Sequence, residues 1–112
     1  MDVNLAMIFI DETRKSLVKL LAAEENFNSR KNKGDEDSLP ISDPEYMEAE
    51  HEVKLFVKQL ETLTGVSFNL TGSEFLVASL AAKHIEPNLK AIEQLIQVLS
   101  RQQDSPGHSK HP

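Results

Sequence analysis

Residues 80–99, LAAKHIEPNLKAIEQLIQVL, have a proline in the middle of a pattern that is otherwise typical of an α-helix. The fold depends on whether Pro87 separates two short helices or lies inside one long helix. Apolar residues keep an unbroken 3-4 spacing on both sides of it: Phe75, Ala78, Ala82, Ile85, Leu89, Ile92, Ile96 and Leu99. Two helices joined by a turn would have no reason to stay in phase.

Pro87 falls on the side away from this apolar row, so its ring does not enter the core. A proline inside a helix costs roughly 3 kcal/mol, and burial of the apolar residues that follow can offset this. Thr71 and Glu74 can form a capping box at the start. The sequence predicts one helix over 73–100, kinked at Pro87. The alternative is a break at Glu86, with Pro87 opening a fourth helix.

The preceding helix has clear ends. Ser42 and Glu45 fit a capping box, and Pro44 lies in the first turn, where it costs no hydrogen bond. Gly65 suits the left-handed position that closes a helix. A helix is therefore predicted over 43–64. Its apolar residues have the 3-4 spacing of a coiled-coil seam: Tyr46, Ala49, Val53, Phe56, Leu60 and Leu63.

The N-terminal segment predicts a third helix, over 4–27, with an apolar stripe that includes Leu17 and Leu20. Its first part, VNLAMIFI (3–10), is apolar nearly all round. This pattern indicates either complete burial or a short strand in place of helix.

The other segments predict no further long helix. Residues 28–42 are rich in charge, Ser, Gly and Pro and predict a flexible linker. Residues 66–72 predict a short extended connection rather than an edge strand. Residues 101–112 predict a disordered tail.

These elements predict an all-α protein of about three helices. The domain organisation is an N-terminal helix (1–27), a linker (28–42), a helical hairpin (43–100) and the tail. The 3-4 rows favour a coiled-coil-like hairpin or bundle.

Composition excludes several classes of protein. The chain has 112 residues, no cysteine and a formal net charge of −6. Without cysteine there is no disulfide scaffold, thiolate metal site or thiol nucleophile. The acidic balance argues against nucleic acid as the main ligand, because phosphate neutralisation dominates such binding. The apolar run 3–10 is too short to span a membrane and lacks the features of a signal peptide. An intracellular protein is expected.

No catalytic, cofactor or metal site assembles in the sequence. Glu48 and His51 have the spacing of a di-iron ligand pair, but there is no second such pair. His108 and His111 lie in the predicted tail. We therefore expect a protein that is not an enzyme and that has no cofactor and no small-molecule substrate.

The apolar rows predict the function as well as the fold. They favour a small acidic helical subunit that assembles through coiled-coil-type seams, either with itself or within a larger protein complex, in a scaffold or adaptor role. The alternative is a self-contained bundle that binds an amphipathic peptide of a partner. The predicted partner-binding residues are Val53, Phe56, Leu60, Leu63, Phe75, Ile85, Leu89, Ile92, Ile96 and Leu99.

Overall fold

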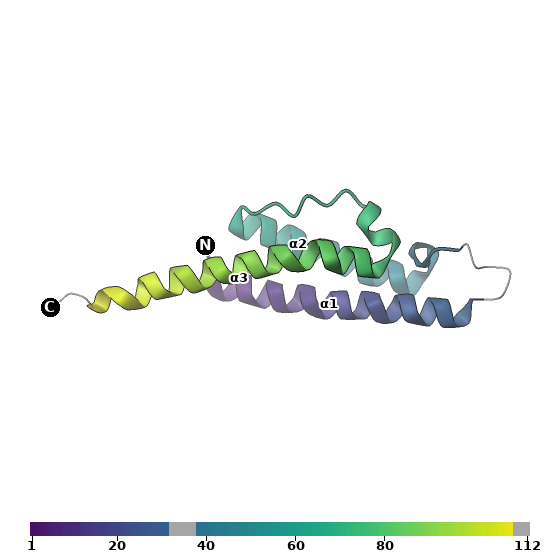
Figure 1. Ribbon diagram of the computed structural model, residues 1–112, viewed down its shortest axis with the longest axis horizontal. Helices are drawn as coiled ribbons and strands as arrows, with labels where there is room; N and C mark the ends of the chain where they lie inside the picture. Colours follow the sequence, from purple (N-terminus) through teal and green to yellow (C-terminus); the bar gives the residue numbers. More distant parts are fainter. Residues whose placement is uncertain (32–37, 109–112) are drawn as a thin grey trace.

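A computed structural model describes the backbone of residues 1–31 and 38–108 and the side chains of 1–31 and 38–101. The described chain is all-α, as predicted, and contains no strand. Its three α-helices are α1 (Val3–Arg30), α2 (Pro44–Thr64) and α3 (Ala78–His108). Two short 3-10 helices, η2 (Pro40–Ser42) and η3 (Ser73–Leu76), precede α2 and α3. The molecule is elongated, with principal extents of 73 × 22 × 18 Å (Figure 1).

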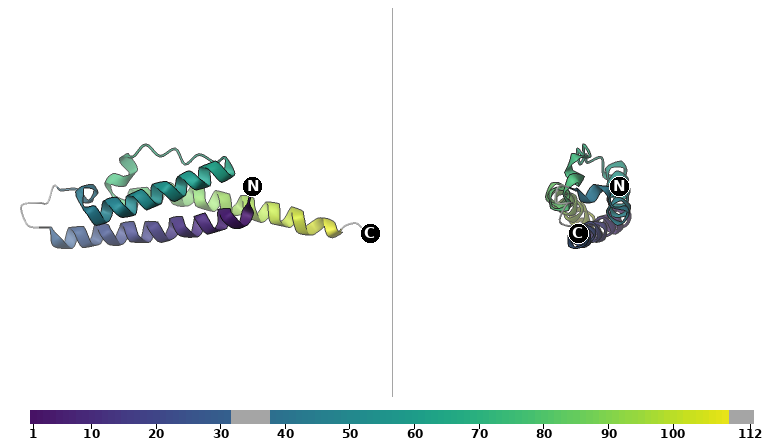
Figure 2. Two further views of the ribbon diagram at one scale, coloured as in Figure 1. Left: turned by 180° about the vertical axis from the view of Figure 1, so that it is seen from behind. Right: turned by 90° about the vertical axis from the view of Figure 1, so that its right-hand side faces the viewer.

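The helix α1 packs along both other helices. Its N-terminal half lies against the C-terminal half of α2, and its C-terminal end lies against the start of both α2 and α3 (Figures 1 and 2). Both neighbours run antiparallel to α1, so α2 and α3 run parallel to each other. The connection 65–77 therefore returns along the bundle. Of the two predicted arrangements the structure is a bundle, and residues 43–100 do not form an antiparallel hairpin.

The helix α3 is continuous through Pro87, which confirms the predicted single helix (Figure 1). The alternative break at Glu86 is wrong. Pro87 is exposed, as its position outside the apolar row predicts. The Asn88 side chain donates to the His84 carbonyl at 3.2 Å.

Replacing Pro87 with alanine is expected to stabilise the bundle, by at most about 3 kcal/mol. Alanine restores the missing amide donor and removes the ring clash, and the exposed position has no packing to lose. Urea unfolding followed by circular dichroism measures the effect. A lower unfolding midpoint would show that the bundle depends on the proline ring.

The two ends of α2 are close to their predicted positions. Gly65 has φ 76°, and its amide donates to the Glu61 carbonyl, which confirms the predicted left-handed end. The cap at the start is different from the prediction. Asp43 accepts from the Tyr46 amide at 3.4 Å, whereas the Ser42 hydroxyl donates to the Leu39 carbonyl. Asp43 directly precedes the helix, so its carboxylate reaches the first turn, and Ser42 instead ends η2.

The start of α3 differs from its predicted position more than the start of α2 does. Glu74 does reach back to the Thr71 amide, at 3.0 Å, but it caps only η3. Val77 is extended, and α3 begins at Ala78 rather than at residue 73. The Ala78 amide donates to a Glu24 carboxylate oxygen of α1 at 2.9 Å. A carboxylate from a distant part of the chain thus satisfies this helix start.

Other boundaries also differ from the predictions. Helix α1 continues to Arg30, into the predicted linker, where Arg30 pairs with Asp43 at 3.3 Å. Pro40 is buried in η2. Helix α3 continues to His108, past the predicted boundary at residue 100. Two predicted segments lie partly outside the described residues. These are the middle of the flexible linker, residues 32–37, and the end of the disordered tail, residues 109–112.

The connection 65–77 closes the side of the bundle between α2 and α3 (Figure 2). Residues 66–72 contain no helix or strand, so they form a connection, as predicted, and not the alternative edge strand. Phe68 is fully buried. Its amide donates to Glu61 of α2 at 2.8 Å, and its carbonyl lies 2.7 Å from His84 Nε2 of α3. The Phe68 side chain and backbone therefore hold the connection to both helices.

Candidate protein-interaction surface

The predicted partner-binding residues lie mainly in the core of the chain itself. Seven of the ten are buried among α1, α2, η3 and α3: Val53, Leu60, Phe75, Ile85, Leu89, Ile92 and Ile96. Phe56, Leu63 and Leu99 are partly exposed, and the Phe56 ring packs on Phe9 of α1 with centroids 6.1 Å apart. Buried side chains contact a partner only if the bundle opens, so these rows hold the chain together.

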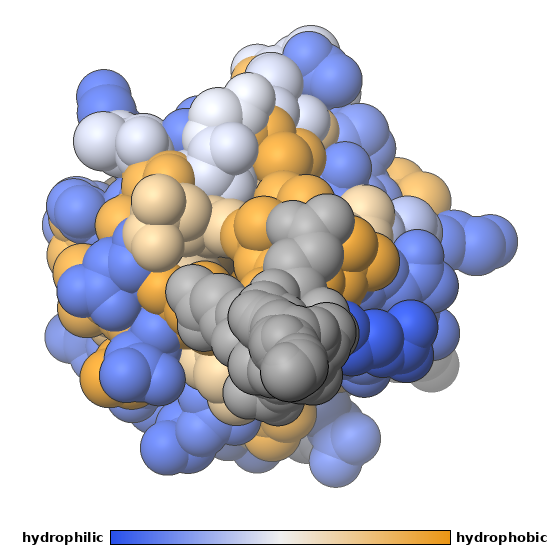
Figure 3. Space-filling view, turned by 90° about the vertical axis from the view of Figure 1, so that its left-hand side faces the viewer, coloured by the Kyte–Doolittle hydropathy of each residue, from blue (hydrophilic) through white to orange (hydrophobic). Residues whose placement is uncertain are grey.

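Apolar side chains remain exposed at the end of the bundle where α1 begins. Met7 and Ile8 of α1 are 54% and 56% exposed. Met1 and Leu5, which precede them in the chain, are also exposed, and so are Leu95 and Val98 of α3, which flank the cleft residues Ile96 and Gln97 in sequence. We call these six residues the apolar end. Orange apolar residues gather near the centre of this face, with blue polar residues toward its edge (Figure 3).

This end corrects the expectation for residues 3–10. The segment is helical, so the predicted strand is wrong, and it is not completely buried either. Only Ala6 and Ile10 are buried within it. The helices α2 and α3 cover only two sides of α1. Because residues 3–10 are apolar on nearly every side, some of their side chains remain exposed to solvent.

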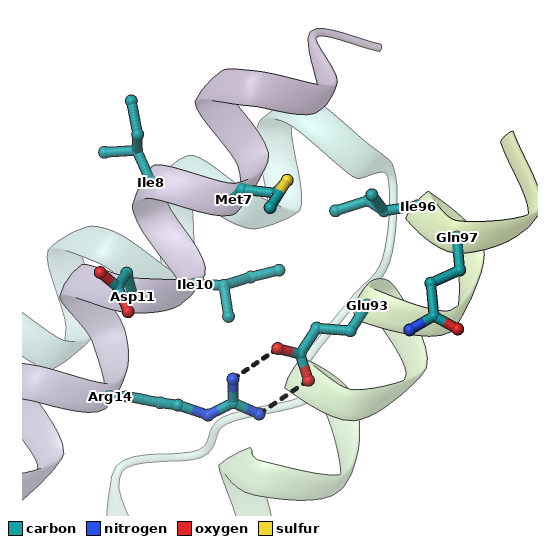
Figure 4. A pocket seen from close by; sticks show the side chains of 8 residues that line it. All are labelled: Met7, Ile8, Ile10, Asp11, Arg14, Glu93, Ile96 and Gln97. Atoms are coloured by element: carbon teal, nitrogen blue, oxygen red, sulfur yellow. Dashed lines mark hydrogen bonds and ion pairs between the residues drawn. The ribbon is translucent and has the colours of Figure 1, made fainter. Parts of the chain in front are cut away.

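A cleft of about 580 Å³ opens between α1 and α3 beside the apolar end. Its walls are formed by Met7, Ile8, Ile10, Asp11 and Arg14 of α1 and by Glu93, Ile96 and Gln97 of α3. Met7 and Ile10 point toward Ile96 across the gap, whereas Ile8 points away from α3 (Figure 4). The cleft is therefore apolar on its floor and polar at one side.

An ion-pair cluster forms that polar side. Arg14 of α1 bonds Glu86 and Glu93 of α3, with the shortest contacts at 2.6 Å to each. Figure 4 shows the pair with Glu93. Hydrogen bonds from Arg14 hold the pKa of the Glu93 carboxyl below its usual range. The same bonds, to Glu93 and then Glu86, raise the pKa of Arg14. Arg14 and Glu93 are therefore both charged near neutral pH.

Arg14→Gln is expected to destabilise the bundle by about 1 kcal/mol at neutral pH, because the cluster is one-third exposed and its pairs are screened by water. The pKa of Glu93 is lower in the folded chain, so its ionisation stabilises the fold above the ordinary glutamate pKa of about 4.3. That stabilisation is lost as the pH falls through the lower folded value. The difference between the two proteins should therefore shrink in acid.

Thermal unfolding between about pH 3 and pH 7 spans the glutamate titration and measures this difference. Lys15→Gln is the control, because Lys15 is largely exposed and only approaches Asp11 at 3.9 Å. Equal pH profiles for the Arg14 and Lys15 variants would contradict the predicted role of the cluster.

The histidines and carboxylates considered as metal ligands can also be placed in the fold. Glu48 and His51 are exposed on α2. Within residues 1–31 and 38–108, no group of three His, Cys, Asp or Glu side chains is arranged to hold a metal ion. The side chain of His108 and the whole of His111 lie outside the described residues. No helix in the described part of the chain is both long and apolar enough to cross a membrane.

Comparisons of the chain with protein-family models, with curated protein sequences and with solved structures find no match.

Two features of this surface left a signal in the sequence. Glu86 and Glu93 are seven residues apart and so share one face of α3, which suits a cation from a neighbouring helix. The apolar character of residues 3–10 on every side was the other signal. Which helix supplies the cation, and which side of α1 stays exposed, depend on contacts between distant parts of the chain.

Proposed function

We propose that this protein is a self-contained helical bundle that acts as a non-enzymatic adaptor inside the cell, binding a helical segment of a partner protein at the apolar end. The observation that carries the proposal is the exposure of Met7 and Ile8 next to the cleft. Contiguous apolar surface of this kind is typical of protein-interaction sites.

Two further features support an adaptor. Methionine is common in surfaces that bind apolar side chains, because its long thioether adapts its shape. The core rows are already filled within one chain, so the fold does not need a partner to bury them. Filled core rows support the peptide-binding alternative over assembly through the 3-4 rows, which stays a prediction.

Self-association is the second candidate. Leu95 and Val98 of α3 are exposed, as Met7 and Ile8 of α1 are, so two copies can bury apolar surface against each other. Homo-oligomers commonly use one self-complementary patch of this kind. In this arrangement the chain is a subunit of a homo-oligomer.

Site-specific photo-crosslinking tests the proposal. A photoreactive amino acid is placed at Ile8, at the apolar end, and separately at Met47, which is equally exposed at the other end of the bundle. In cells that express the protein, position 8 is expected to give a discrete adduct with another protein, and position 47 none. An adduct of two copies supports the second candidate. No adduct at position 8, or equal adducts at both positions, overturns the proposal.

A further inference from the structure

The cleft between α1 and α3 reaches the core of the bundle. Ile10 and Ile96 form its floor and are almost fully buried, while Met7 stands exposed at its edge (Figure 4). An apolar side chain that enters the cleft would contact all three. The volume of about 580 Å³ lies within the range of cavities that enclose drug-sized groups, so more than one side chain can enter.

The charged groups at and beside the cleft carry a small surplus of negative charge. Asp11, Arg14 and Glu93 line it, and Arg14 already bonds Glu93 and Glu86. Lys15 lies 3.9 Å from Asp11 and 4.0 Å from Glu12, and Lys90 is close enough to act on Glu93 through its charge. In this group the carboxylates outnumber the cations by one. The whole chain has a net charge of −6. Charge complementarity therefore favours a basic ligand over a second acidic copy.

The shape of the cleft suits a helix. Its walls come from two neighbouring antiparallel helices, and the residues that line it belong to α1 and α3 alone. A helix laid along such a groove presents one apolar residue per turn to the floor and polar residues to the rim. The exposed Met7 and Ile8 extend the apolar contact beyond the cleft.

We propose that this cleft binds a basic amphipathic helix of a partner protein. The apolar residues of that helix pack on Met7, Ile10 and Ile96, and a lysine or arginine pairs with Asp11 or Glu93. The inference rests on the proposed function and specifies the chemistry of the partner.

The test uses the full chain and two fluorescein-labelled peptides of about 18 residues, or five helical turns. Both have the same leucine positions on one face; the polar face is lysine in one and glutamate in the other. Fluorescence anisotropy is expected to show saturable binding of the lysine peptide, weakened by salt, and no binding of the glutamate peptide.

Two matched variants locate the binding. Met7→Ser is expected to weaken binding of the lysine peptide about tenfold. Met47→Ser removes an equally exposed methionine near the start of α2, at the other end of the bundle from the cleft. This variant is expected to leave binding unchanged. Both side chains are about half exposed, so both variants should lose little thermal stability, and to a similar extent.

A third variant tests the charge. Asp11→Lys reverses the charge of an exposed side chain at the rim of the cleft. It is expected to weaken binding of the lysine peptide more than Met7→Ser does. Equal effects of Met7→Ser and Met47→Ser, or equal binding of the two peptides, would overturn the inference. So would a dimer in sedimentation that Met7→Ser dissociates, because a second copy would then occupy the cleft. A crosslinked partner at position 8 without lysine-peptide binding would leave the proposed function standing and refute this inference.

Discussion

Leu60→Asp is expected to unfold most of the chain. Leu60 of α2 is fully buried in the core, where a carboxylate finds no solvent and no positive partner. An unpaired buried charge costs several kcal/mol, against a total stability of about 5–15 kcal/mol for a domain. Ile92→Asp on α3 should have the same effect, because Ile92 is also fully buried. Far-ultraviolet circular dichroism and urea unfolding measure the loss.

The matched control is Leu55→Asp. Leu55 lies on the same helix but is 46% exposed, so its carboxylate stays hydrated and helicity should be kept. A different outcome would support the function first predicted from the sequence. If Leu60→Asp kept its helicity and only dissociated an assembly, the 3-4 row would face a partner rather than the core of its own chain.

Local signals explain why the helices could be predicted. Pro44 and Gly65 act through their own backbone angles, so the bounds of α2 follow from a few neighbouring residues. The 3-4 row through Pro87 indicated one continuous helix, because the row reports which side of α3 is buried over its whole length.

Contacts between distant residues explain most of the errors. Thr71 and Glu74 have the spacing of a capping box, yet α3 begins later, at Ala78. There a carboxylate oxygen of Glu24 in α1 accepts a hydrogen bond from the first amide of the helix. No window of neighbouring residues contains that partner. The direction of α3 was missed for a different reason. The predicted connection, residues 66–72, has a length that is usual between antiparallel helices. Because α3 begins only at Ala78, the actual connection over 65–77 is long enough to return along the bundle.

The candidate site shows the limit of the apolar pattern. A row such as Val53 and Leu60 shows which residues avoid water, but not whether another helix of the same chain or of a partner covers them. In the fold they are covered internally. The surface that we propose for interaction lies at Met7 and Ile8, where the sequence is apolar on all sides and the bundle has too few helices to cover it.

Phe68→Ala is expected to lower the free energy of unfolding by about 3–5 kcal/mol, the usual cost of removing a buried aromatic ring. The Phe68 side chain is fully buried. Its backbone bonds to Glu61 and His84 hold the connection between α2 and α3. Truncation leaves a cavity where the connection meets the core, and the remaining backbone bonds cannot fill it.

Leu76→Ala is the control, because Leu76 belongs to the same connection but is exposed; its effect should be below about 1 kcal/mol. Urea unfolding compares the two variants. Hydrogen exchange then locates the change, with faster exchange expected at the Phe68 amide and in η3 than in α1. If Phe68→Ala cost no more than Leu76→Ala, the connection would not be part of the core, and α2 and α3 would have to be held by α1 alone.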